Sequence, residues 1–154
     1  MMKYRHTFSV NASIEEVVQF HRRSASMADI TPPPVVVRVQ HAPELLSSGD
    51  EMAFTLWIGP LSVPWVARIE QVTETGVIDR QIDGPFQHWV HRHTFVPLDQ
   101  AKTEIRDEIE TELSSFGRRW LVGLGMRLNL PVLFAYRAWK TRRLLERSGQ
   151  WNAS

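Results

Sequence analysis

Alternation of apolar and polar residues between residues 35 and 113 is the feature that most constrains the fold of this chain. Residues two apart lie on the same face of a β-strand, so alternation predicts strands with one buried face. Turns such as Gly59-Pro60 and Gly84-Pro85 separate the alternating segments, and strands joined in this way are antiparallel neighbours. The pattern predicts a meander of six strands, over residues 35–40, 51–58, 63–70, 77–83, 86–95 and 103–113.

The residues before this meander add one strand and one or two short helices. Residues 4–10 alternate and predict the strand. Ser13 and Glu16 have the spacing of a capping box, which begins a helix. A second short helix is expected before the three prolines at positions 32–34, since proline cannot continue a helix. The length fits one domain, expected over residues 1–148, with a frayed tail over residues 149–154.

The residues after the meander predict a long helix over residues 117–147, bent near Pro131. We expect its apolar stripe to cover the sheet; the stripe comprises Leu121, Leu124, Leu128, Val132, Ala135 and Trp139. Arginines and lysines are frequent in the same segment, so weak contact with an anionic membrane surface is an alternative use of this helix. Arg127 interrupts the apolar run and argues against a transmembrane span.

The fifth strand of the meander, residues 86–95, has an unusual face. Its alternate residues Trp89, His91, His93 and Phe95 lie on one side. In the next strand, Asp107 is the one acidic residue on an otherwise apolar face. Strands that are neighbours in sequence usually pair, so we expect the two imidazoles and the carboxylate to meet inside the domain.

This cluster of two histidines and one aspartate admits several interpretations. Asp107 can accept a hydrogen bond from an imidazole simply to leave no buried polar group unpaired. The cluster can recognise the polar end of a ligand in a pocket lined by Trp65, Trp89 and Phe95. An imidazole held by a carboxylate can also act as a general base. The ligand count matches a non-haem iron site, but the sequence offers no further ligand, so we expect no metal and no cofactor.

Composition excludes other classes of protein. The chain has no cysteine, which excludes disulfides and thiolate chemistry and, with the absence of a signal-peptide pattern, favours a cytoplasmic protein. Its 18 basic and 17 acidic residues nearly balance, and no recognition module is visible, so we expect no nucleic-acid partner. Residues 77–83 alternate poorly, which leaves open whether Asp79 and Gln81 face the interior. Nothing in the sequence predicts an oligomeric state.

The order of elements and several short motifs resemble the START-like superfamily of polyketide cyclases/dehydrases and lipid-transport proteins (SRPBCC, birch-pollen-allergen-like). The similarity is closest to its bacterial ligand-binding, cyclase/dehydrase-like branch. The residues that carry it are Asp79-Arg80-Gln81, Gly84-Pro85-Phe86, the series Trp89, His91, His93 and Phe95, then Thr103, Asp107, Phe134, Tyr136 and Arg137. The resemblance implies an α+β helix-grip fold. In this fold a curved antiparallel sheet of about seven strands wraps around a long C-terminal helix and encloses a cavity.

The resemblance also implies a function. Members of this superfamily hold lipids, hormones, polyketides or other apolar molecules in the cavity, and a minority catalyse reactions. We therefore expect a protein that binds or carries an apolar small molecule or lipid, with a site formed by Trp65, Trp89, His91, His93, Phe95 and Asp107. One alternative is a cyclase-, dehydratase- or isomerase-type enzyme with a cavity histidine as base. A regulatory partner protein on the same fold is a second alternative.

Overall fold

A computed structural model describes the backbone of residues 1–151 and the side chains of residues 1–146. Its strands are β1 (Met2–Val10), β2 (Val35–His41), β3 (Glu51–Ile58), β4 (Leu61–Thr73), β5 (Gly76–Asp83), β6 (Phe86–Asp99) and β7 (Lys102–Leu113). Its helices are α1 (Ile14–Arg22), α2 (Ser26–Asp29), α3 (Gly117–Leu128) and α4 (Leu130–Trp151). Helix α4 continues into the segment expected to be a tail, and residues 152–154 lie outside the described part.

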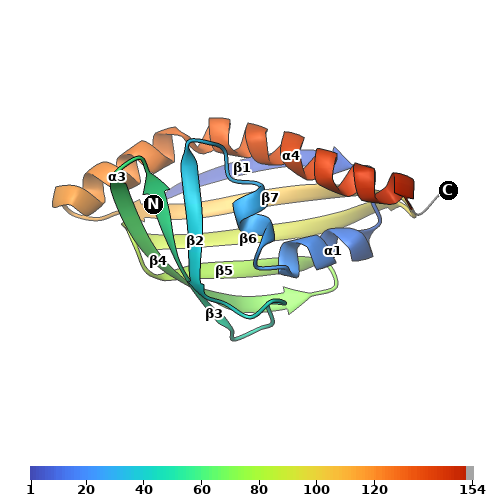
Figure 1. Ribbon diagram of the computed structural model, residues 1–154, viewed down its shortest axis with the longest axis horizontal. Helices are drawn as coiled ribbons and strands as arrows, with labels where there is room; N and C mark the ends of the chain where they lie inside the picture. The colour runs from blue at the N-terminus through green and yellow to red at the C-terminus, as the bar shows by residue number, and fades with distance from the viewer. Residues whose placement is uncertain (152–154) are drawn as a thin grey trace.

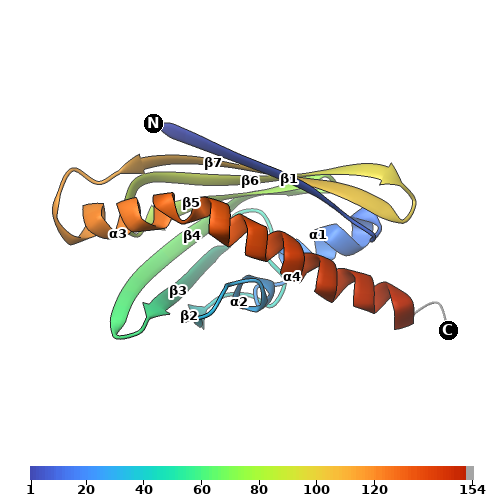
Figure 2. The ribbon, with the colours of Figure 1, turned by 90° about the horizontal axis from the view of Figure 1, so that it is seen from above.

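The seven strands form one antiparallel sheet in the order β1-β7-β6-β5-β4-β3-β2. Strands β2 to β7 are therefore the predicted meander, and β1 joins its far edge beside β7. Figure 1 shows β5, β6, β7 and β1 side by side, with β2, β3 and β4 at a steep angle to them. Figure 2 shows that the sheet curls around α1, α2 and α4. The predicted helix-grip architecture is confirmed.

Helix α1 begins where the sequence predicts, because the capping box at its start is formed. The Ser13 hydroxyl accepts a hydrogen bond from the Glu16 backbone N–H, and the Glu16 carboxylate accepts one from the Ser13 N–H. These two bonds satisfy N–H groups that have no partner within the helix. The helix then buries Val17 and Phe20 inside the curled sheet.

The core lies between the concave face of the sheet and the helices. In β7 every second residue is buried, in the predicted register: Thr103, Ile105, Asp107, Ile109 and Thr111. Each fully buried isoleucine or phenylalanine stabilises the fold by about 1.5–3 kcal/mol relative to an exposed one. Asp107 therefore lies in the most deeply buried part of the sheet.

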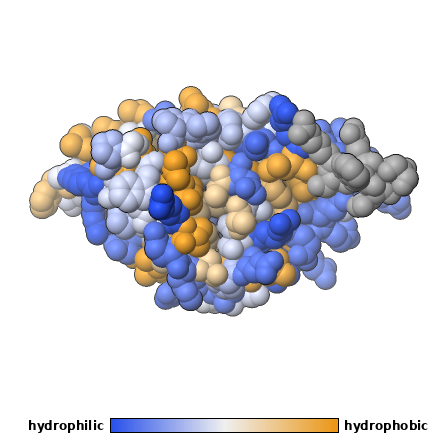
Figure 3. Space-filling view, in the orientation of Figure 1, coloured by the Kyte–Doolittle hydropathy of each residue, from blue (hydrophilic) through white to orange (hydrophobic). Residues whose placement is uncertain are grey.

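The prediction that the apolar stripe of the C-terminal region faces the sheet is wrong. Leu121, Leu128 and Val132 are 63%, 72% and 65% exposed, and Figure 3 shows apolar side chains along this end of the molecule. The predicted bend is present, with α3 ending at Leu128 and Asn129 between the helices. The break resets the rotation of α4, which buries a second series instead: Leu130, Phe134, Ala138, Thr141 and Leu145.

Over the described residues, no helix combines the length and the apolar character needed to cross a membrane.

Candidate functional site

The sheet brings His91, His93 and Asp107 together on its concave face. His93 lies directly opposite Asp107 in the pairing of β6 with β7. The Nε2 atom of His91 lies 2.9 Å from Oδ1 of Asp107 and donates a hydrogen bond to it. The Nδ1 atom of His93 lies 2.7 Å from the same oxygen, although the ring is not aligned for a hydrogen bond. One carboxylate oxygen thus contacts both imidazoles.

Asp79 joins this cluster, and Gln81 does not. Asp79 lies opposite His91 in the pairing of β5 with β6. Its Oδ2 atom is 3.9 Å from Nδ1 of His91 and 3.9 Å from Nε2 of His93. The Gln81 amide instead bonds both the backbone N–H and the carbonyl of Phe86, and so closes the turn between β5 and β6. A Cβ on Gly84 would lie 2.6 Å from the Gln81 side-chain oxygen, so a larger residue there would displace this hydrogen-bonded amide.

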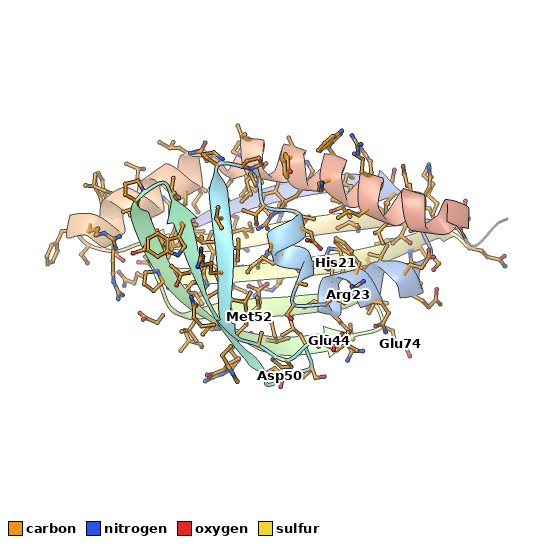
Figure 4. The ribbon with its side chains drawn as sticks, viewed as in Figure 1. His21, Arg23, Glu44, Asp50, Met52 and Glu74 are labelled. Carbon is orange, nitrogen blue, oxygen red and sulfur yellow. The ribbon has the colours of Figure 1, made fainter. Side chains whose placement is uncertain are left out.

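Two helices cover the cluster. From α4, the Phe134 ring packs edge-on against His91 at 5.6 Å between ring centroids. The Arg137 guanidinium lies 5.4 Å from the centroid of Phe134, and its Nε atom is buried without a hydrogen-bond partner. From α1, the His21 ring lies 4.9 Å from that of His93. Figure 4 labels His21 at the end of α1.

His21 is a site residue that the sequence did not reveal. Its ring contacts Phe95 at 4.7 Å as well as His93, and its Nδ1 donates to the carbonyl of Val17. A histidine four residues after a buried valine shares that valine's helix face, which is the one signal that could have identified it.

The predicted aromatic residues are buried beside the polar cluster. Trp65 and Trp89 meet edge-to-face at 5.3 Å between ring centroids, and Phe86 lies 4.9 Å from Trp89. Phe95 is buried at the other end of the same face of β6. The imidazoles of His91 and His93 therefore lie between two aromatic regions. This arrangement combines a large apolar surface with a few polar groups, as ligand sites do.

Burial determines the charge states in the cluster. Burial lowers the pKa of His91 and of His93, and Asp107 only partly offsets this effect, so both rings are neutral at neutral pH. Burial alone would raise the pKa of Asp107, but the contacts with the two imidazoles hold it well below its usual range. Burial raises the pKa of Asp79 to about 6. The site thus holds one firmly ionised carboxylate beside two neutral imidazoles.

Polar atoms elsewhere in this interior have no hydrogen-bond partner. The Nδ1 atom of His6 and the Nε atom of Arg137 are buried and make no hydrogen bond. The His6 ring lies 5.8 Å from Phe134, on the same covered side of the sheet. Buried polar atoms are nearly always paired with protein, water or ligand. The interior therefore has hydrogen-bonding capacity that the chain itself does not use.

No protein-family model matches the sequence, and no curated protein matches it either. Solved structures do resemble the fold. A START superfamily protein from Mycobacterium smegmatis has a TM-score of 0.66 and 13% identity, covering 94% of this chain and 97% of its own. The ZhuI aromatase/cyclase from Streptomyces sp. R1128 has a TM-score of 0.64 and 17% identity, and the match covers 93% of this chain and 95% of ZhuI. Norcoclaurine synthase from Thalictrum flavum, in complex with dopamine and hydroxybenzaldehyde, has a TM-score of 0.69 and 14% identity. This match covers 95% of this chain and 87% of the synthase chain.

Proposed function

We propose that this protein, which has the helix-grip fold of the START-like superfamily, binds an apolar small molecule or lipid between its sheet and α4. The observation that carries the proposal is the set of buried, unpartnered polar atoms within an aromatic interior. A ligand with an apolar body and one polar end meets both conditions, because its body packs on the aromatic rings and its polar end bonds the free groups. Norcoclaurine synthase supports this, since a protein of similar fold was solved in complex with the small aromatic molecules dopamine and hydroxybenzaldehyde.

The polar groups favour a ligand whose polar end is rich in oxygen. Arg137 only donates, and its free Nε atom needs an acceptor. One nitrogen of each neutral ring is held at Asp107, so the other nitrogen of His91 and of His93 can accept a hydrogen bond. A phenol or enol hydroxyl, which can donate to an imidazole and accept from Arg137, suits this set. Trp65 and Trp89 provide apolar surface for the remainder of the molecule.

The test is to identify what the purified protein carries. Native mass spectrometry and organic extraction should recover an apolar molecule, and an apolar fluorescent probe should compete with it. Replacing His91 or His93 with phenylalanine should weaken binding about tenfold, the effect of losing one good hydrogen bond. His88→Phe, on the other face of the same strand, is the matched control. If nothing apolar is recovered and no probe binds, the proposal fails.

A catalytic function is the second candidate, and the bond between His91 and Asp107 favours it. A neutral imidazole oriented by an ionised carboxylate can remove a proton beside a carbonyl group, the first step of cyclisation or dehydration. The ZhuI structure shares the fold and is an aromatase/cyclase. Deuterium exchange at such a proton, followed by NMR, should drop by about 10²-fold or more in His91→Gln if this base is used. A carrier would show no exchange above the buffer rate.

The exposed side of the C-terminal helices favours contact with a membrane during ligand uptake. Leu121, Leu128 and Phe116 are exposed in the same region as the cations Arg118 and Arg119. Apolar side chains interleaved with arginines bind anionic lipid surfaces. Vesicles of phosphatidylcholine and phosphatidylserine should co-sediment the protein at low salt, and Leu121→Glu should weaken this. Absence of co-sedimentation would remove the idea.

A further inference from the structure

Three side-chain atoms that can bind a metal ion converge on the concave face of the sheet. Asp79, His91 and His93 each offer one such atom, and the three atoms lie within 4.8 Å of one another. The Oδ2 atom of Asp79 is 3.9 Å from Nδ1 of His91 and 3.9 Å from Nε2 of His93. These are the two ring nitrogens that do not contact Asp107. Each imidazole therefore contacts Asp107 with one nitrogen and faces Asp79 with the other.

The contact with Asp107 determines where each ring carries its hydrogen. An ionised carboxylate can only accept hydrogen bonds. His91 donates from Nε2, so in the neutral ring its Nδ1 carries a lone pair. The Nδ1 atom of His93 lies 2.7 Å from the same oxygen, a distance that is favourable only when this nitrogen carries the hydrogen. Its Nε2 atom then also carries a lone pair, and both lone pairs face Asp79.

No lysine or arginine of the described residues contacts Asp79 directly, and Arg137 acts on it only from a distance. Two imidazole lone pairs and a carboxylate oxygen repel one another unless a cation or a hydrogen lies among them. A separation of 3.9 Å is too long for a direct hydrogen bond. The ion pairs within the described residues bring no lysine or arginine to Asp79, which meets only the two histidines.

We propose that Asp79, His91 and His93 bind a divalent first-row transition metal ion, such as Zn²⁺ or Fe²⁺. Two imidazoles and one carboxylate are a donor set that both ions accept. Zinc ligands lie about 2.0–2.2 Å from the ion, so the three atoms draw together when it binds. The sequence alone could not offer this site, because the orientation of Asp79 depends on the pairing of β5 with β6.

Asp107 has the position of a carboxylate that supports ligating histidines. Such a group accepts a hydrogen bond from the ring nitrogen opposite the metal, which fixes both the tautomer and the ring orientation. Here a single buried carboxylate accepts a hydrogen bond from His91 and lies 2.7 Å from Nδ1 of His93. A structural network alone needs one nitrogen of each ring satisfied. It does not explain why the two remaining nitrogens point at a third acceptor.

Three protein ligands leave at least one coordination position open. Arg137 is close enough to influence both Asp79 and Asp107, so an anion is the favoured occupant of that position. Hydroxide or the ionised oxygen of a bound small molecule would satisfy this preference. The metal site does not rest on the apolar ligand proposed above, because its three ligands come from the chain alone.

The experiment uses the full chain, freed of metal with EDTA and then titrated with ZnCl₂ in a calorimeter. One equivalent should bind, and Co²⁺ should give the visible absorption bands of a four- or five-coordinate site. Asp79→Asn and His93→Gln should each lower the affinity at least about tenfold, and Asp107→Asn about 10- to 100-fold. Asp83→Asn on the same strand as Asp79, and His88→Gln on the outer face of β6, are matched controls and should bind as the wild type does.

Circular dichroism and the Tm of each metal-free variant show whether it is folded, and affinities are compared among folded variants only. Absence of one-equivalent binding by the wild type would overturn the proposal. Equal weakening by Asp79→Asn and Asp83→Asn would also overturn it, since the ion would then bind elsewhere. The probe is the metal ion alone, so a protein that binds zinc but no apolar molecule keeps this site and refutes the carrier proposal.

Discussion

The two faces of β7 place carboxylates in opposite surroundings. On the outer face, Glu108 lies 2.7 Å from Arg5, and Glu110 lies 3.0 Å from Arg92. On the inner face, Asp107 lies within 2.9 Å of the rings of His91 and His93. Asp107 and Glu108 are adjacent in sequence, yet Glu108 pairs with arginines at the surface and Asp107 contacts neutral imidazole rings in the core.

The carboxylates on the two faces of the sheet therefore differ in how much each of their contacts contributes to stability. The Arg5 side chain is 72% exposed and that of Asp107 is 5% exposed. Exposed ion pairs contribute about 0–1 kcal/mol each, because water and salt screen them. A buried carboxylate has no water to replace a lost partner, so each of its contacts matters more. The outer pairs can be exchanged at little cost, and the inner cluster cannot.

Asp107→Ala is the most damaging change expected. It leaves the His91 Nε2–H buried without an acceptor and removes the contact with His93, which together cost about 3–5 kcal/mol of unfolding free energy. Glu108→Ala, one residue away, should cost under about 1 kcal/mol. Urea denaturation at neutral pH measures both. Equal losses would show that the two faces do not differ as described.

Asp79→Asn should instead raise the free energy of unfolding of the metal-free protein. Burial raises the pKa of Asp79 to about 6, above the value of 3.8 that applies to the unfolded chain. Its contribution to stability is therefore fully present below the unfolded value and is lost as the pH rises through about 6. The asparagine avoids this loss, so it should stabilise the protein by up to about 3 kcal/mol near neutral pH, at roughly 1.4 kcal/mol per pKa unit.

Denaturation with EDTA present, at about pH 4 and about pH 7.5, measures this effect, which should vanish at the lower pH. Asp83→Asn, at an exposed position of the same strand, is the matched control and should not stabilise the protein near neutral pH, because Asp83 pairs with Arg119. A stabilisation that is the same at both pH values would mean that the charge of Asp79 is not its cause.

Glu110→Gln should have the smallest effect of the three. Burial slightly opposes ionisation of Glu110, but Lys3 and Arg92 outweigh it and lower the pKa. The resulting stability is present above the unfolded value of 4.5 and is lost as the pH falls below it. We expect a loss under about 1 kcal/mol at neutral pH, which about 1 M NaCl should remove. If the loss of stability persists in salt, the ion pairs of Glu110 are not screened by solvent, and the contrast with the inner cluster is wrong.

Much of this comparison could be predicted from the sequence. Clean alternation in β7 predicts which residues face inward and identifies Asp107 as the exception among them. The side of Asp79 could not be predicted, because β5 alternates poorly and its pairing with β4 shifts register twice. The orientation of α4 could not be predicted either. The break at Asn129 changes which of two apolar series faces the sheet, and only packing decides between them.

The pairing of β1 with β7 has a consequence for how the protein is made. Met2 pairs with Thr111, so β1 is synthesised well before the strand with which it pairs. The strands of the meander find their neighbours within a few residues, whereas β1 must close a loop that spans most of the chain. Docking of β1 should therefore be a late step in folding, after β7 has been synthesised.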